Sequence, residues 1–113
     1  MSAIWQDLKN DMHALDVAVD EARESGINFA VAEAKYQAAK AKKALEMKAD
    51  KVPVTLIETV IKGMPEVNEL LMERLSAEAI YKVSQEHIMS LKLQIKVNND
   101  QYQREWNQAG RTQ

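Results

Sequence analysis

Residues 51–65 read KVPVTLIETVIKGMP, and this stretch holds most of the strong helix breakers of the chain. Pro53, Gly63 and Pro65 all lie here. Residues 3–50 contain no proline and a single glycine, and residues 66–109 contain neither. Proline cannot donate an intrahelical hydrogen bond, and glycine costs about 1 kcal/mol inside a helix. The sequence therefore predicts two long helices, one on each side of a short connection.

Within this connection, apolar residues recur at helical spacing and predict a short amphipathic helix. Pro53 fits its first helical position, and Gly63 fits a left-handed residue just after its end. Pro65 then opens the second long helix, with Glu66 in a first turn that favours negative charge. We predict one helical domain over residues 1–113, with helices at about 3–50, about 53–62 and about 65–109.

Both long helices repeat apolar residues with a mean spacing of about 3.5 positions, which is typical of a coiled-coil seam. Charge favours antiparallel pairing within the chain. Residues 1–34 carry two basic and seven acidic side chains, whereas residues 35–51 carry six basic and two acidic ones. Folding back at the connection brings this lysine-rich end beside the acidic start of the second helix. We therefore predict an all-α, coiled-coil-like antiparallel helical hairpin. The residues that define its seam at intervals of seven are Leu8, Leu15, Ala22, Phe29 and Tyr36, with Tyr81, Ile88, Ile95 and Tyr102.

The apolar stripes are wider than a two-helix seam requires. Val17, Val31 and Val83 are among the residues that widen them. A hairpin buries one seam only, and the wider stripes indicate more than one neighbour for each helix. We therefore expect a homodimer in which two hairpins complete a helical bundle.

The composition disfavours most catalytic and metal-binding classes. The 113 residues include no cysteine, so thiolate chemistry and disulfides are excluded. Three glycines at positions 26, 63 and 110 cannot form a phosphate-binding loop. His13 and His87 lie far apart in the hairpin and show no metal-ligand spacing. The sequence thus predicts a protein that is not an enzyme and that holds no cofactor or metal.

The chain also lacks the signals of membrane or secreted proteins. No apolar run approaches the ~20 residues needed to cross a bilayer. The N-terminal residues lack the basic start and apolar stretch of a signal peptide. We therefore expect a cytoplasmic protein.

Two surfaces are candidates for contact with a partner. The first is the apolar connection, where residues at the tip of a hairpin are hard to bury. It either folds down as a cap or stays exposed as a docking patch. Its candidate residues are Val54, Leu56, Ile57, Val60, Ile61 and Lys62.

The second candidate surface is a cluster of lysines in the last part of the first helix. Such a cluster suits contact with phosphates or with an acidic protein, but it also suits pairing with the acidic start of the second helix. The net charge of −2 disfavours a dedicated nucleic-acid binder. The cluster comprises Lys35, Lys40, Lys42, Lys43, Lys48 and Lys51.

Several segments resemble small helical proteins of tailed bacteriophages of Gram-positive bacteria. The resemblance spans almost the whole chain, but its motifs are helical packing patterns. The family usually has Ala-Arg-Gly at the centre, where this chain has Ile61-Lys62-Gly63 and thus a lysine in place of the arginine. No functional residues carry over from the family. The segments are Ile4–Leu8 (IWQDL), Ala32–Tyr36 (AEAKY), Pro53–Ile57 (PVTLI) followed by Lys62-Gly63, Ala77–Tyr81 (AEAIY) and Gln103–Trp106 (QREW).

The resemblance implies an early-expressed phage protein encoded near replication and recombination genes, in the cytoplasm of the host cell. Proteins of this sort commonly bind and redirect a host or phage protein such as a nuclease, a defence effector or a recombination factor. The leading hypothesis is therefore a protein-binding module that modulates DNA metabolism or anti-phage defence. The alternatives are an accessory protein that binds DNA or RNA during replication or recombination, and a structural or assembly protein of the virion.

Overall fold

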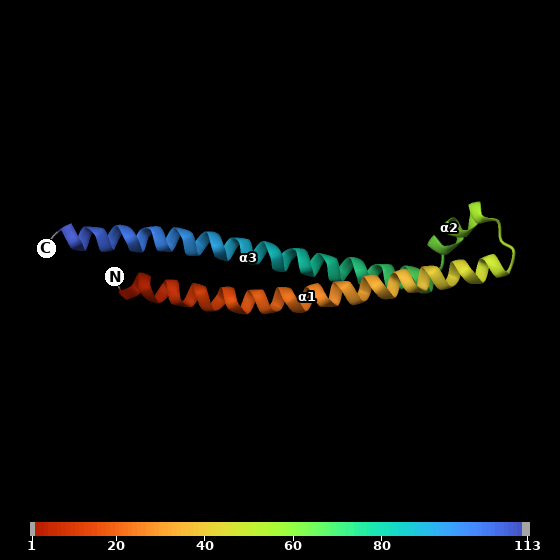
Figure 1. The fold of residues 1–113 in the computed structure, drawn as a ribbon, viewed down its shortest axis with the longest axis horizontal. Coiled ribbons are helices and arrows are strands. Elements are labelled where there is room, and N and C mark those ends of the chain that lie inside the picture. Colours follow the sequence, from red (N-terminus) through yellow and green to blue (C-terminus); the bar gives the residue numbers. More distant parts are fainter. Residues whose placement is uncertain (1, 112–113) are drawn as a thin grey trace. The chain divides into compact units, whose positions relative to one another are not determined.

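The computed structural model describes residues 2–111, which form three helices and no strand. Helix α1 spans Ser2–Ala49, α2 spans Val54–Lys62, and α3 spans Pro65–Arg111. The long helices run antiparallel, and α2 lies in the connection between them (Figure 1). The predicted all-α helical hairpin with a short helix at its connection is thus confirmed.

The chain divides into two compact units, and both long helices contribute to each. The terminal unit contains residues up to Arg23 and residues from Lys82 onward. The turn unit contains Glu24–Tyr81, and therefore all of α2.

In the terminal unit, the heptad residues form a narrow apolar seam. Leu8, Ala18, Ala22 and Leu91 are buried. Polar groups interrupt this seam at Asp11. The amide Nδ2 of Asn98 donates to its Oδ2 at 2.6 Å, and the amide Nε2 of Gln94 donates to its Oδ1 at 3.2 Å. Polar pairs at the seam of a coiled coil favour one register, because a slipped alignment separates the partners.

The open end of the terminal unit carries the two tryptophans. The ring of Trp5 packs against Tyr102, with 5.7 Å between the ring centroids. Trp5 and Trp106 are both about half exposed. The aromatic pair that links the helices here is therefore Trp5 with Tyr102.

In the turn unit, the seam contains a buried serine and a tight glycine contact. Ser25 is buried, and the neighbouring Gly26 faces the ring of Tyr81. A Cβ atom on Gly26 would lie 3.1 Å from Cε1 of that ring, which is closer than such contacts normally are. Glycine in the middle of α1 thus makes room for a tyrosine of α3, which also packs against Phe29.

Two ion pairs join α1 to α3 in the turn unit. An Nη1 atom of Arg74 lies 3.0 Å from Oε2 of Glu33, and Nζ of Lys43 lies 3.3 Å from Oε1 of Glu66. The second pair is the predicted contact between the lysine-rich end of α1 and the acidic start of α3. These partly exposed pairs select the antiparallel alignment more than they add stability.

Helix α1 ends in a Schellman motif. The N–H of Lys51 donates to the carbonyl of Lys48, and the N–H of Val52 donates to the carbonyl of Met47, both at 3.0 Å. Lys51 has a φ of 63° and is the only described non-glycine residue with positive φ. The left-handed residue of the connection is therefore a lysine.

The prediction that Gly63 is left-handed is wrong, since its φ is −92°. The short helix α2 closes instead with two tight turns. Gly63 N–H donates to the carbonyl of Val60 at 3.1 Å, and Met64 N–H donates to that of Ile61 at 3.0 Å. The prediction that Pro53 is the first helical residue is wrong by one position, since Pro53 is the N-cap and α2 begins at Val54. Pro65 begins α3 as predicted.

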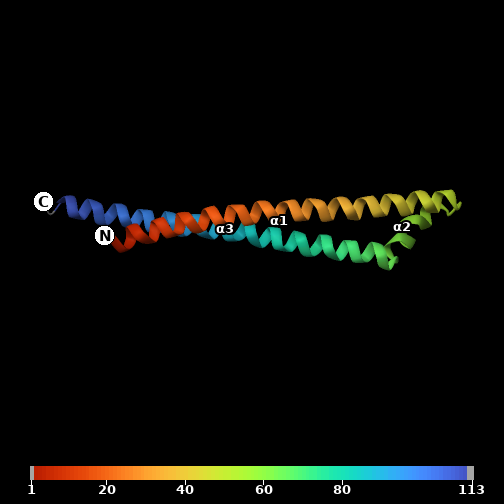
Figure 2. The same cartoon turned by 90° about the horizontal axis from the view of Figure 1, so that it is seen from below.

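Helix α2 lies between the end of α1 and the start of α3 (Figure 2). Its apolar face closes a small core at the turn. Ile57 and Ile61 lie one helical turn apart and are buried against Met47 of α1 and Val67 of α3. Tyr36, Ala44, Val52 and Met64 pack around this cluster.

Candidate binding cleft

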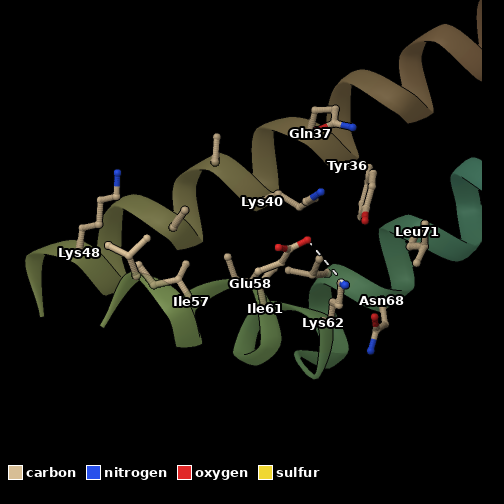
Figure 3. A pocket seen from close by; sticks show the side chains of 14 residues that line it. Tyr36, Gln37, Lys40, Lys48, Ile57, Glu58, Ile61, Lys62, Asn68 and Leu71 are labelled. Atoms are coloured by element: carbon tan, nitrogen blue, oxygen red, sulfur yellow. Dashed lines mark ion pairs between the residues drawn. The ribbon is translucent and has the colours of Figure 1, made fainter. Parts of the chain in front are cut away.

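A cleft of about 490 Å³ lies in the turn unit, where α2 faces α1 and the start of α3 (Figure 3). We call it the turn cleft. Its apolar lining consists of Tyr36, Ala41, Ala44, Val54, Ile57, Ile61, Val67 and Leu71. Its polar lining consists of Gln37, Lys40, Lys48, Glu58, Lys62 and Asn68.

The cleft arises because α1 presents small side chains where α2 approaches. Ala41 and Ala44 of α1 lie in the lining, across from Val54, Ile57 and Ile61 of α2. Alanine fills little volume, so the space between the two helices stays open. The core contacts of Ile57 and Ile61 fix α2 in place and thereby define one wall.

At one end of the cleft, two cationic side chains lie close to the ring of Tyr36. Nζ of Lys40 lies 5.1 Å from the ring centroid, and the Arg74 guanidinium lies 5.5 Å from it. Both distances allow cation–π attraction. Glu33 holds Arg74 from the other side, and the pKa of Glu33 is lowered, first by the hydrogen bond from Gln37 and then by that from Arg74. Tyr36 and Lys40 are thus held in defined positions.

Lysines from two helices line the cleft. Lys40 and Lys48 come from α1, and Lys62 comes from α2 (Figure 3). The acidic lining residue Glu58 lies 3.6 Å from Lys62, but both side chains are about three-quarters exposed, so this pair is weak. The cleft therefore combines an apolar wall with an excess of positive charge.

The structure separates the predicted connection residues into two groups. Val54, Ile57, Ile61 and Lys62 line the cleft. Leu56 and Val60 lie outside the lining and are 51% and 44% exposed. One face of α2 is therefore a cap over the core, and another face is exposed.

The predicted lysine cluster is separated in the same way. Lys40 and Lys48 line the cleft, whereas Lys43 pairs with Glu66 and with Glu46. The pKa of Lys43 is raised, chiefly by the hydrogen bond to Glu66. The remaining lysines of the cluster, which are exposed and lie outside the cleft lining, are Lys35, Lys42 and Lys51.

Sequence reasoning did not identify Tyr36, Ala41, Ala44, Leu71 and Glu58 as cleft residues. A usable signal was present. Alanines at positions 41 and 44, one helical turn apart, mark a face of α1 with little side-chain volume. The position of α2 over that face depends on the Schellman motif at the end of α1. The sequence does not indicate this motif, because its left-handed residue is a lysine and not the usual glycine.

The cleft offers contact surface and positive charge. Among residues 2–111, no group of three or more histidine, cysteine or acidic side chains is arranged to hold a metal ion. Within the same residues, none of the helices has the length and apolarity required to traverse a bilayer. Comparisons of the chain with models of protein families, with curated proteins and with solved structures found no match.

Proposed function

We propose that this chain is a non-enzymatic protein-binding module, and that the turn cleft holds an acidic, amphipathic segment of its partner. The observation that carries the proposal is the lining itself, in which an apolar wall adjoins Lys40, Lys48 and Lys62. Apolar side chains of a partner would replace water on the wall, and carboxylates would pair with the lysines. An isolated small anion would leave the apolar wall wet.

The size of the cleft supports a peptide segment as the ligand. A volume of about 490 Å³ falls within the range of small-molecule pockets, and it accommodates several side chains of one helix or strand. The cleft is partly open to solvent, so a segment of a partner can reach its lining. Recognition of an amphipathic helix in an apolar groove follows the same physical pattern.

The resemblance to proteins of tailed bacteriophages supports a more specific version of the proposal. In that version the chain is phage-encoded and acts in the host cytoplasm. Its partner is a host or phage protein of DNA metabolism or anti-phage defence, whose activity it modulates. The cleft supplies the contact, and the partner supplies whatever activity is modulated.

Nucleic-acid binding is the second candidate, and the lysine count is the observation that favours it. The arrangement gives it less support, because Lys43 is occupied by Glu66 and Glu46, and Lys40 lies over Tyr36. It predicts binding to DNA or RNA that falls steeply between 50 and 200 mM salt. An anisotropy titration that shows no binding at about 50 mM salt removes this candidate.

Affinity capture tests the proposed function with two matched variants of α2. The tagged chain is expressed in phage-infected bacterial cells, and captured proteins are quantified for wild type, Val54→Ser and Leu56→Ser. Val54 lines the cleft and Leu56 does not, yet both side chains are exposed and apolar. Burial of a valine contributes about 1–2 kcal/mol, so Val54→Ser should reduce partner recovery roughly tenfold.

The Leu56→Ser control should retain the partner. Circular dichroism on both variants checks that the helices are intact. Equal recovery with Val54→Ser and wild type would contradict the proposal, as would loss of the partner in Leu56→Ser alone.

A further inference from the structure

Helix α1 carries a second apolar stripe in the turn unit, on the face opposite the hairpin seam. Its residues are spaced alternately by four and three positions, which places them on one side of an α-helix. All six are exposed, and the large ones, Ile27, Val31 and Leu45, are 58%, 48% and 67% exposed. We call this the outer stripe. It comprises Ile27, Val31, Ala34, Ala38, Ala41 and Leu45.

The outer stripe matches itself when two copies run antiparallel. The alanines in the centre allow two backbones to approach closely, and the large residues lie at the ends. In this alignment Ile27 faces Leu45, Val31 faces Ala41, and Ala34 faces Ala38. Each pair is apolar. The stripe residues alternate between heptad positions a and d, and each pair joins an a position to a d position, as in an antiparallel coiled coil.

Only one register gives this match. A shift by one heptad in one direction sets Glu24 against Ala41, and the opposite shift sets Lys48 against Val31. Either shift buries a charge against an apolar side chain, which is costly. In the matched register, Glu24 and Lys48 lie at the same level on opposing chains and have opposite charges. A parallel pair would instead place Lys48 beside its own equivalent.

We propose that the outer stripe is a self-association surface on which a second copy of this chain packs antiparallel about a two-fold axis. The contact is isologous, so it closes after two copies. It does not depend on the proposed function of the turn cleft, although Ala41 of the stripe and Lys48, which meets Glu24 in the matched register, also line the cleft. The stripe is about 27 Å long at 1.5 Å rise per residue.

The size of the contact sets the expected affinity. Two such stripes bury roughly 1,000 Å² in total, which is near the lower bound for a specific interface. We therefore expect a dissociation constant in the micromolar range. Lys35 and Lys42 flank one edge of the stripe, and that edge adjoins the same edge of the other copy. The lysines of the two copies therefore repel each other, and the measurements should be made at about 0.3 M salt, where this repulsion is screened.

Sedimentation equilibrium tests the surface with two double variants. Ile27→Gln/Leu45→Gln changes the outer stripe, and Met72→Gln/Leu75→Gln changes exposed apolar residues of α3 in the same unit. Wild type should shift with concentration from 12.8 kDa to twice that mass. The α1 variant should weaken the dimer at least tenfold, and the α3 variant should not. A wild-type chain that stays monomeric at millimolar concentration would overturn the proposal. An equal loss in both variants would do the same.

Cysteine cross-linking tests the orientation, because the chain contains no cysteine of its own. Ala34→Cys and Ala38→Cys are prepared as separate variants and oxidised alone and as an equal mixture. The antiparallel register brings position 34 of one copy beside position 38 of the other. The mixture should therefore form disulfide-linked dimers, and neither variant should do so alone. Cross-linking of each variant with itself would indicate parallel helices and overturn the proposed alignment.

Discussion

Replacing Lys51 with glycine should stabilise the chain, because Lys51 occupies the left-handed position of a Schellman motif. Its φ of 63° brings the Cβ atom close to the backbone. Glycine has no Cβ and is the usual residue at this position. The motif itself should persist in the variant, since its two hydrogen bonds involve backbone atoms only. The contact of Val52 with the Met47 cluster should also persist.

The expected gain follows from two opposing terms. A left-handed conformation costs a residue with a side chain about 1–2 kcal/mol, which glycine avoids. Glycine also has more freedom in the unfolded chain, which costs about 0.5–1 kcal/mol on folding. The net gain is about 0.5–1 kcal/mol, or roughly 3–5 °C in the thermal midpoint for a chain of this size.

Thermal and urea unfolding, followed by circular dichroism at 222 nm, measure this gain. Asp50→Gly is the matched control, because Asp50 precedes Lys51 and does not have positive φ. The control should lose about 0.5–1 kcal/mol. A Lys51→Gly midpoint at or below that of wild type would refute the reasoning about the turn.

Other contacts of the turn unit give three further predictions. Gly26→Leu should lower the free energy of unfolding, measured in urea, by about 1–3 kcal/mol, because a Cβ there would lie 3.1 Å from the Tyr81 ring. If the ring is the obstacle, adding Tyr81→Ala restores part of this loss. Ile57→Ala should cost about 2–4 kcal/mol, since the side chain is 7% exposed within the turn core, and an unchanged urea midpoint would show that α2 does not hold the unit together. The pKa values of Glu33 and Glu66 are lowered from 4.5 by their hydrogen bonds, so their stabilising effect is present above that pH and lost as pH falls through the folded values. Urea midpoints should therefore drop between pH 5 and pH 3, and a Glu33→Gln/Glu66→Gln variant that drops as steeply would exclude these groups as the cause.

The helices could be predicted because their ends depend on local chemistry. Pro65 begins α3, and the breakers around it mark the connection, since proline and glycine affect the helix at their own positions. The heptad spacing likewise predicted which residues form the seam, because side-chain direction in a helix repeats with a fixed period. Leu8 and Ala22 are buried as this spacing requires.

The cleft could not be predicted, because it depends on how α2 packs over α1. A turn that contains Lys51 in a left-handed conformation sets that packing, and local propensity favours glycine or asparagine there. Gly63 was expected to be left-handed, but its φ is −92°. The different burial of Leu56 and Ile57, which are neighbours in sequence, also follows from how α2 packs. One side chain enters the core and the other remains exposed.

The central claim is that the turn cleft binds an acidic segment of a partner protein, and two lysine pairs test it most directly. Lys40→Gln/Lys48→Gln removes charge from the cleft lining, whereas Lys35→Gln/Lys42→Gln removes the same charge from α1 outside it. Binding of the captured partner is titrated against wild type and both variants. The account predicts at least a tenfold loss of affinity for the cleft pair and less than a twofold loss for the other pair. Equal losses, or a larger loss for Lys35→Gln/Lys42→Gln, would contradict it.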